Sequence, residues 1–251
     1  MRVIQPSANT HILLPDNSPL PFEENWFEPS YWQQQNKVVG EKKGRAKTYF
    51  LNLGEQIGVL RHYWRGGLVG KVLSDQYLFS RLENTRTYQE FQLLTQLEEL
   101  GLPVSKPIAA KVQRSGLIYR GDLITEAITG AQSVLDKLKQ TPLTEPEWQA
   151  TTETLARFHN AGVFHADLNI NNILFDEQGK VFLIDFDRGE IRKPSQQTVE
   201  NNMARLKRSF IKELNRNTEF YWQESEWDEF YALYRSFLKI SARFKTKKPK
   251  H

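Results

Sequence analysis

The sequence predicts an α+β fold whose first part is built on an antiparallel sheet and whose second part is mainly helical. Runs rich in β-branched and aromatic residues, bounded by glycine or proline, predict strands in 38–53, 58–63 and 107–128. Apolar residues at helical spacing predict helices in 82–100, 145–160, 203–214 and 227–244. Most strands precede residue 128 and three of the four helices follow it, so we expect one long helix to accompany the sheet.

The composition limits the class of protein. The chain has 251 residues, enough for one large domain or two modest lobes. It has no cysteine, which excludes disulfides and thiolate metal sites. No basic-then-apolar leader opens the sequence, and no apolar run approaches the roughly 20 residues of a membrane-spanning helix. We therefore expect a cytoplasmic protein.

The formal net charge is +4 and is unevenly distributed. Residues 201–251 contain 12 Lys and Arg against 6 Asp and Glu, whereas residues 1–200 contain 22 against 24. The sequence ends in the basic run Lys-Thr-Lys-Lys-Pro-Lys-His at 245–251. Such a run is either a solvated tail or a segment attracted to an anionic surface, nucleic acid or acidic lipid.

The stretch 165–187 combines two short apolar runs with polar side chains at both ends. The runs 173–175 and 181–184 flank a glycine-containing turn and predict a hairpin. Because antiparallel strands run back past each other, residues before the first strand should lie beside residues after the second. The three side chains brought together would be Asp167, Asn172 and Asp185. They offer the oxygen ligands that Mg²⁺ requires, although an ordinary polar hairpin with acidic caps is the alternative.

The same stretch resembles the catalytic centre of protein-kinase-like phosphotransferases. It contains His-x-Asp-Leu-x-x-x-x-Asn at 165–172 and Asp-Phe-Asp at 185–187, where those enzymes have Asp-Phe-Gly. The resemblance implies that Asp167 accepts or orients the proton of the substrate hydroxyl. It also implies that Asn172 and Asp185 hold Mg²⁺ on the phosphates of ATP.

Two earlier segments are candidates for binding the ATP phosphates. A turn with Gly40 and Gly44, rich in lysine and arginine, could bring backbone amides close to phosphate oxygens. The pattern Gly-x-Gly-x-x-Gly is missing, so a plain basic hairpin is the alternative. In strand 58–63, Arg61 stands where protein kinases carry the lysine that grips phosphates, and His62 is the second candidate.

Two acidic residues complete the predicted nucleotide site. Glu90 falls on the apolar face of helix 82–100, and a buried carboxylate usually needs a cationic partner, so we predict an ion pair with Arg61. Glu126 ends the segment that corresponds to the kinase hinge, where backbone groups bind adenine. The resemblance implies a bilobal protein-kinase-like fold with an N-terminal arm, an N-lobe and a C-lobe, at 1–35, 36–128 and 129–251.

With these residues assembled, the chain resembles the lipopolysaccharide kinase family over nearly its whole length. The motifs are Gly-Arg-x-x-Thr-Tyr-Phe (44–50), Leu-Arg-His-Tyr-x-Arg-Gly-Gly-Leu (60–68), Gly-Leu-Pro-Val-x-Lys-Pro-Ile-Ala (101–109), His-x-Asp-Leu-Asn-x-x-Asn-Ile-Leu (165–174), Asp-Phe-Asp (185–187) and Leu-Lys-Arg-Ser-Phe-x-Lys-Glu (206–213). The resemblance implies ATP-dependent phosphorylation of a hydroxyl of 3-deoxy-D-manno-octulosonic acid (Kdo), taken to be the 4-hydroxyl, on a Kdo–lipid A precursor.

The resemblance also implies a location. The acceptor lipid lies in the anionic cytoplasmic leaflet, so we expect peripheral attachment to the cytoplasmic face of the inner membrane through the basic C-terminal region, and no binding of nucleic acid.

Other functions compete with this interpretation. They are phosphorylation of another small molecule or of a lipopolysaccharide heptose, a protein kinase, and a kinase-like binding module without catalysis. The short connection from Asp185 to Asn201 and the missing Ala-Pro-Glu argue against a protein kinase. The complete set of Asp167, Asn172 and Asp185 argues against a module without catalysis.

Overall fold

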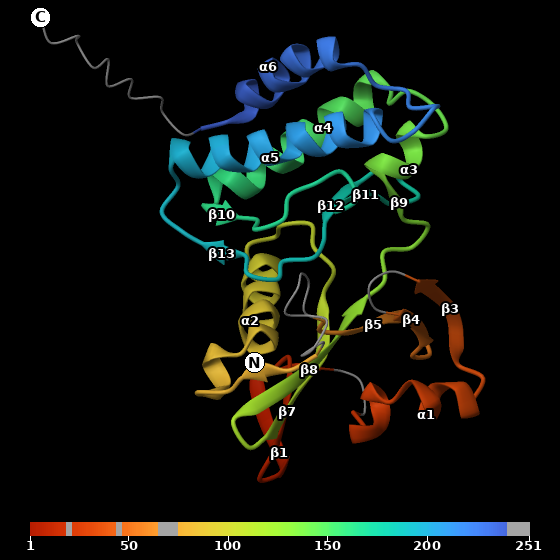
Figure 1. The fold of residues 1–251 in the computed structure, drawn as a ribbon, viewed down its shortest axis with the longest axis vertical. Helices are drawn as coiled ribbons and strands as arrows, with labels where there is room; N and C mark the ends of the chain where they lie inside the picture. Colours follow the sequence, from red (N-terminus) through yellow and green to blue (C-terminus); the bar gives the residue numbers. More distant parts are fainter. Residues whose placement is uncertain (19–21, 44–46, 65–74, 240–251) are drawn as a thin grey trace, which may run out of the picture. The chain divides into compact units, whose positions relative to one another are not determined.

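The structure is a computed structural model that describes residues 1–18, 22–43, 47–64 and 75–239 (Figure 1). The chain divides into two compact units: unit 1 comprises Met1–Ala131 and Phe182–Gly189, and unit 2 comprises Gln132–Val181 and Glu190–His251. Gly44, residues 65–71 and the basic run 245–251 lie outside the described residues. The predicted boundaries of arm, N-lobe and C-lobe stay predictions.

Unit 1 is built on an eight-stranded antiparallel sheet, which confirms the α+β prediction. Along the sheet the order is β1-β2-β7-β8-β5-β4-β3, and β6 pairs with β8. The strands are β1 (Arg2–Ser7), β2 (Thr10–Leu14), β3 (Val38–Lys43), β4 (Lys47–Asn52), β5 (Ile57–His62), β6 (Tyr77–Leu78), β7 (Pro107–Ser115) and β8 (Ile118–Glu126). The sequence predicted β3 to β5, β7 and β8, whereas β1 and β2 were expected to be part of a draped arm.

Helix α2 (Arg86–Glu99) packs on one face of this sheet, here called the inner face (Figure 1). Thr85 caps the helix by accepting a hydrogen bond from the main chain of Tyr88, and Phe91, Leu94 and Leu97 are buried. The approach to β8 is close at Gly121, where an added Cβ would lie 1.9 Å from the Thr87 hydroxyl. Glycine at this position therefore lets the helix lie directly on the strand.

The opposite, outer face of the sheet is covered by the N-terminal residues. The 3₁₀ helix η1 (Glu24–Phe27) and helix α1 (Pro29–Gln34) bring in the rings of Trp26, Phe27 and Trp32. These rings form one core with aliphatic side chains of the sheet, among them Ile12, Leu60 and Ile124. The indole of Trp32 donates a hydrogen bond to the carbonyl of Trp26 over 2.7 Å. The aromatics of this segment therefore pack on the sheet.

Unit 2 is mainly helical. Its helices are α3 (Val134–Leu138), α4 (Glu145–Asn160), α5 (Gln196–Leu214), the 3₁₀ helix η4 (Glu224–Glu226) and α6 (Trp227–Phe237). Helices α4, α5 and α6 lie together (Figure 1). Their rings meet in the core, because Trp148 of α4 contacts Phe210 of α5 and Phe230 of α6. Short strands accompany them: β9 (Gln132–Ser133), β10 (Val163–Phe164), β11 (Ile173–Phe175) and β13 (Glu190–Ile191). The chain passes back to unit 1 within β12 (Val181–Leu183).

Three predicted helix ends differ from the structure. The helix predicted from residue 82 begins at Arg86, after the N-cap Thr85, and Leu82–Asn84 form the separate 3₁₀ helix η3. Helix α5 begins at Gln196 because the Ser195 hydroxyl accepts a hydrogen bond from Thr198. Helix α6 stops at Phe237 because the side chain of Asn160 donates to the Phe237 carbonyl and accepts from Lys239. The predicted end of this helix, at residue 244, lies outside the described residues.

Candidate active site

The loop that carries Asp167 is held by its buried neighbours in unit 2. The main chain of His165 bonds in both directions to the buried amide of Asn202 on α5, with distances of 3.1 Å from His165 N to Oδ1 and 2.8 Å from Nδ2 to His165 O. The His165 ring accepts from the main chain of Asp167 over 3.2 Å. Asn202 therefore fixes the loop, and the His165 ring fixes the backbone of Asp167.

A buried histidine supports Asn202 from behind. The ring of His159 lies 3.2 Å from Asn202 Oδ1 and 2.7 Å from the hydroxyl of Tyr234 on α6. Burial lowers the pKa of His159 to about 4, so its ring stays neutral near pH 7. The loop is thus connected through Asn202 and His159 to the helical core of unit 2.

Two asparagine side chains of the Asp167 loop donate hydrogen bonds to the same main-chain carbonyl. Nδ2 of Asn172 donates to the carbonyl of Asp167 over 3.0 Å, and Nδ2 of Asn169 donates to the same carbonyl over 2.8 Å. Because the amide nitrogen of Asn172 donates its hydrogen bond to the Asp167 carbonyl, the amide oxygen is the atom suited to bind a metal ion.

The Asp167 carboxylate is largely exposed and faces an arginine that we did not predict as a site residue. Nη1 of Arg205, on α5, lies 3.3 Å from Asp167 Oδ1, and the two side chains are 45% and 58% exposed. The signal in the sequence was the group of basic residues within the predicted helix 203–214. An exposed carboxylate beside an exposed guanidinium can contact both a hydroxyl and an anionic group of one ligand.

In unit 1, Arg61 bridges two carboxylates. Nη2 of Arg61 lies 2.5 Å from Glu90 of α2, and Nη1 lies 2.9 Å from Asp185. Glu90 is 1% exposed and also accepts from the hydroxyl of Tyr63 over 2.5 Å. The predicted ion pair between Arg61 and Glu90 is therefore confirmed. Burial alone would lower the pKa of Arg61, but Glu90 and then Asp185 raise it above its usual range, so the guanidinium stays charged.

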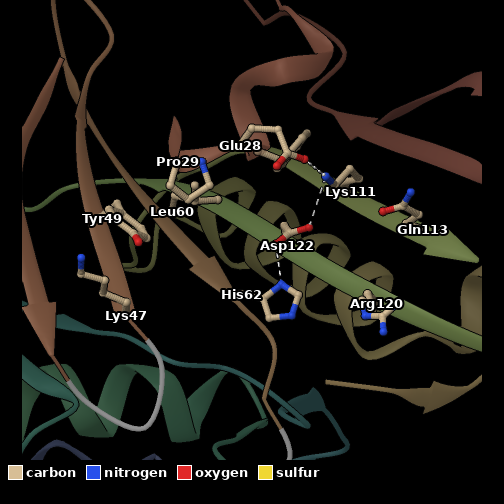
Figure 2. Close-up of a pocket in the computed structure, with 11 residues that line it drawn as sticks. Glu28, Pro29, Lys47, Tyr49, Leu60, His62, Lys111, Gln113, Arg120 and Asp122 are labelled. Carbon is tan, nitrogen blue, oxygen red and sulfur yellow. Dashed lines mark hydrogen bonds and ion pairs between the residues drawn. The ribbon is translucent and has the colours of Figure 1, made fainter. Parts of the chain in front are cut away.

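His62 lies on the other face of the sheet from Arg61. Successive side chains of a strand point to opposite faces, and Arg61 points to α2 on the inner face. His62 instead lines a pocket of about 240 Å³ on the outer face, with Tyr49, Leu60, Lys111 and Asp122 among its walls (Figure 2). Arg61 and His62 therefore cannot both be candidates for the same phosphate site.

The charges in this outer pocket are balanced by internal ion pairs. Nδ1 of His62 lies 2.7 Å from Asp122 (Figure 2), and Nε2 lies 3.5 Å from Asp75. Lys111 pairs with Asp122 and with Glu28 of the N-terminal segment, at 3.7 and 3.1 Å. Arg120 pairs with Asp75 and Lys47 with Glu41, at 2.6 and 2.8 Å. The network connects the N-terminal segment with β5, β7 and β8.

The remaining predicted nucleotide residues are placed only in part. Gly40 lies inside β3 opposite Phe50, rather than in the turn, which corrects its predicted position. Glu126 ends β8, and its main-chain nitrogen donates to the carbonyl of Lys106 over 2.8 Å. Strands β11 and β12 form where the hairpin was predicted. The approach of Asp167 and Asn172 to Asp185 stays a prediction because these residues belong to different units.

Comparison with known proteins identifies the relatives of this chain. The model of the lipopolysaccharide kinase (Kdo/WaaP) family matches residues 29–234. The chain is 45% identical to the 3-deoxy-D-manno-octulosonic acid kinase of Vibrio parahaemolyticus over 80% of its own length and 83% of that protein. It is 42% identical to the enzyme of the same name from Mannheimia succiniciproducens, with 86% and 92% coverage, and 43% identical to that from Haemophilus influenzae, with 83% and 89% coverage. Within the described residues, no helix combines the length and apolar character needed to cross a membrane.

The Asn202 anchor can be tested by its removal. Asn202→Ala leaves the buried N–H and C=O of His165 without these partners, and an unsatisfied buried group costs about 1–3 kcal/mol. We expect the free energy of unfolding, measured by urea denaturation, to fall by about 2–4 kcal/mol. Asn201→Ala, at an exposed neighbour that contacts Gln197, is the control. An equal loss in both variants would contradict the anchoring role.

The outer network predicts a pH dependence of stability. Burial alone would lower the pKa of His62, but the hydrogen bond and charge of Asp122, joined by Asp75, raise it above its usual value. The protonated ring therefore stabilises the fold fully below the unfolded pKa of about 6.5, and this contribution is lost as pH rises through the folded pKa. We expect His62→Gln to lower the free energy of unfolding more at pH 5.5 than at pH 9 in urea titrations.

The control for this experiment is Gln113→Ala, which changes an uncharged side chain that lines the same pocket. Because neither glutamine nor alanine titrates, its effect on the free energy of unfolding should be the same at the two pH values. A pH-independent loss in His62→Gln would refute the contribution of the charged ring.

Proposed function

Because this chain belongs to the lipopolysaccharide kinase (Kdo/WaaP) family, we propose that it transfers the terminal phosphoryl group of ATP to a Kdo hydroxyl, the 4-hydroxyl, of a Kdo–lipid A precursor. The observation that carries the proposal is the identity of 41–45% to proteins named 3-deoxy-D-manno-octulosonic acid kinase over most of both chains. The exposed Asp167, held in a rigid loop, supports it because a hydroxyl acceptor needs a positioned base.

In this proposal Asp167 accepts or orients the proton of the acceptor hydroxyl. Its carboxylate is accessible, while its main chain is held by His165, Asn169 and Asn172. Arg205 is next to it and can bind a carboxylate or phosphate of an acidic glycolipid, which fits an acceptor that contains Kdo. One fixed loop and one fixed helix would thereby orient the acceptor.

The donor set fits magnesium. Asn172 and Asp185 offer an amide and a carboxylate oxygen, the hard ligands that Mg²⁺ prefers, and a site with few protein ligands is usually completed by phosphate oxygens and water. The Asp185 side chain is 39% exposed, so it can be reached while Arg61 contacts one of its oxygens. When bound, Mg²⁺ would neutralise phosphate charge during transfer.

The donor site would be formed by residues of unit 1. Arg61 would contact the phosphates with the guanidinium that Glu90 and Asp185 hold in place. The segment between β3 and β4, which contains Gly44, would approach the phosphates through backbone amides, and the backbone at Glu126 would contact the adenine. These roles follow from the resemblance to protein kinases and are part of the proposal.

The activity is tested with purified protein, ATP, Mg²⁺ and a Kdo–lipid A acceptor, with products read by mass spectrometry. We expect one phosphoryl group to be added to Kdo, and fragmentation to place it on the 4-hydroxyl. Asp167→Asn should lower turnover about 10²- to 10⁴-fold, the usual worth of a positioned base, while Mg–ATP still binds. Asp228→Asn, which alters an exposed carboxylate of α6, is the control. Unmodified acceptor in the wild-type reaction, or full turnover of Asp167→Asn, would refute the proposal.

We further propose that the protein attaches peripherally to the anionic cytoplasmic face of the inner membrane, where a lipid acceptor would lie. The support is the excess of basic residues in 201–251 and the basic outer face of α5, formed by Arg205, Lys207, Arg208 and Lys212. Each Lys or Arg near such a surface contributes on the order of 1 kcal/mol, so a few of them suffice for reversible binding.

Co-sedimentation with anionic vesicles tests this attachment. The full chain should sediment at low salt and be released at high salt, because a Debye length of about 10 Å at 0.1 M screens surface attraction. A truncation after Arg243 should sediment less. Equal sedimentation of both forms would exclude the terminal run and leave the basic face of α5 as the candidate. Failure of both forms to sediment at low salt would refute the proposal.

A further inference from the structure

The third residue of the Asp-Phe-Asp segment is bound by an arginine of helix α2. Nε of Arg86 donates to Asp187 Oδ1 over 2.7 Å, and Nη2 pairs with the second carboxylate oxygen. A bidentate guanidinium–carboxylate pair fixes orientation as well as distance. Asp187 stands where protein kinases carry glycine, so this position has gained an anchor that glycine cannot provide.

Helix α2 holds the segment at two points one turn apart. Arg86 and Glu90 are four residues apart and therefore lie on one face of the helix. Arg86 contacts Asp187 directly, whereas Glu90 reaches Asp185 through Arg61. The two aspartates are two residues apart in the segment. Helix, segment and strand β5 are thus closed into a ring of charge pairs within unit 1.

Contacts other than the one with Asp187 also hold Arg86 in place. Its guanidinium lies over the ring of Tyr77, 5.0 Å from the centroid, and Nη1 donates to the Tyr77 hydroxyl over 3.1 Å. Its main-chain nitrogen donates to the hydroxyl of Tyr119, whose ring stacks on that of Tyr77. The arginine is therefore a preorganised part of the sheet and helix surface rather than a mobile surface side chain.

The backbone of the segment needs such support. Asp185 has a φ of +65°, in the left-handed region that residues other than glycine seldom adopt. Phe186 is fully buried, and the nitrogen of Gly189 donates to its carbonyl over 2.7 Å. A strained conformation persists only where the surroundings hold it. Arg61 holds the side chain of Asp185 on one side, and Arg86 holds Asp187 on the other.

We propose that Arg86 and Asp187 are positioning residues that lock Asp185 in the conformation that binds metal. The inference rests on the proposed function, since that function makes Asp185 a Mg²⁺ ligand. Aspartate at position 187 replaces a flexible glycine with a fixed anchor. The segment then stays in one state with respect to α2, and the orientation of Asp185 does not depend on a bound ligand.

The test compares Asp187→Asn with Asp75→Asn in the full-length protein. Both substitutions take a carboxylate of 20% side-chain exposure away from an arginine of unit 1, but Asp75 pairs with Arg120 on the outer network. We expect the Mg²⁺ concentration for half-maximal ATP binding to rise about 10- to 100-fold in Asp187→Asn, the usual effect of removing a residue that orients a metal ligand. Asp75→Asn should match the wild type, and Arg86→Lys, which keeps charge but loses the bidentate geometry, should lie between.

A second measurement needs no metal. Amide hydrogen exchange of 185–189 in the metal-free protein should be faster in Asp187→Asn than in the wild type and in Asp75→Asn. Wild-type exchange together with wild-type Mg²⁺ dependence in Asp187→Asn would overturn the inference, as would equal Mg²⁺ shifts in both variants. If the wild type bound no ATP in a Mg²⁺-dependent way, the proposed donor site would be wrong, and so would the positioning role of Arg86 and Asp187 in it. Acceptor phosphorylation enters neither measurement, so a wrong acceptor would leave both results intact.

Discussion

The contact of Arg61 with Glu90 and Asp185 is the interaction on which the candidate site depends. It joins strand β5, helix α2 and the Asp-Phe-Asp segment, three parts of unit 1 that are distant in the sequence. Protein kinases carry lysine at this position, but a lysine ammonium is a point charge on a flexible chain. A planar guanidinium can serve two carboxylates through separate nitrogens. The two carboxylates around Arg61 therefore suit an arginine better than a lysine. If Arg61 were removed, the charge of the buried Glu90 would have no cationic partner.

Local signals explain which parts of the fold could be predicted from the sequence. Helix α4 was predicted with both ends as observed, because Pro146 stands in its first turn and Gly162 follows its end. In the structure a capping box of Thr144 and Glu147 begins the helix, and Gly162 has a φ of +79°. The strands around Arg61 and the pairing of Glu90 followed from periodicity and from the cost of a buried charge. By contrast, β1 is exposed at every position, so no alternation marked it as a strand.

The features that the sequence did not reveal depend on contacts between distant residues. Asn202 is one asparagine among several in a polar helix start, and only the fold shows that it bonds the main chain of His165, 37 residues away. The early end of α6 is caused by Asn160, which is 77 residues from Phe237. Arg205 was visible only as part of a group of basic residues. That Arg61 and His62 lie on opposite faces of the sheet could have been predicted from the sequence, since adjacent residues of a strand point to opposite faces.

The charges around Asp185 suggest why metal and nucleotide would bind together. Arg61 contributes one positive charge, whereas Glu90 and Asp185 contribute two negative charges, so this cluster has an excess negative charge before any ligand binds. An anionic nucleotide alone would be repelled by that excess. A divalent cation at Asp185 would reverse the sign of the cluster and attract phosphate oxygens. In the outer network each lining cation already pairs with a carboxylate, and the charges balance when His62 is protonated. The Asp185 cluster is therefore the one suited to a metal-bound anion, whereas the outer network mainly holds strands together.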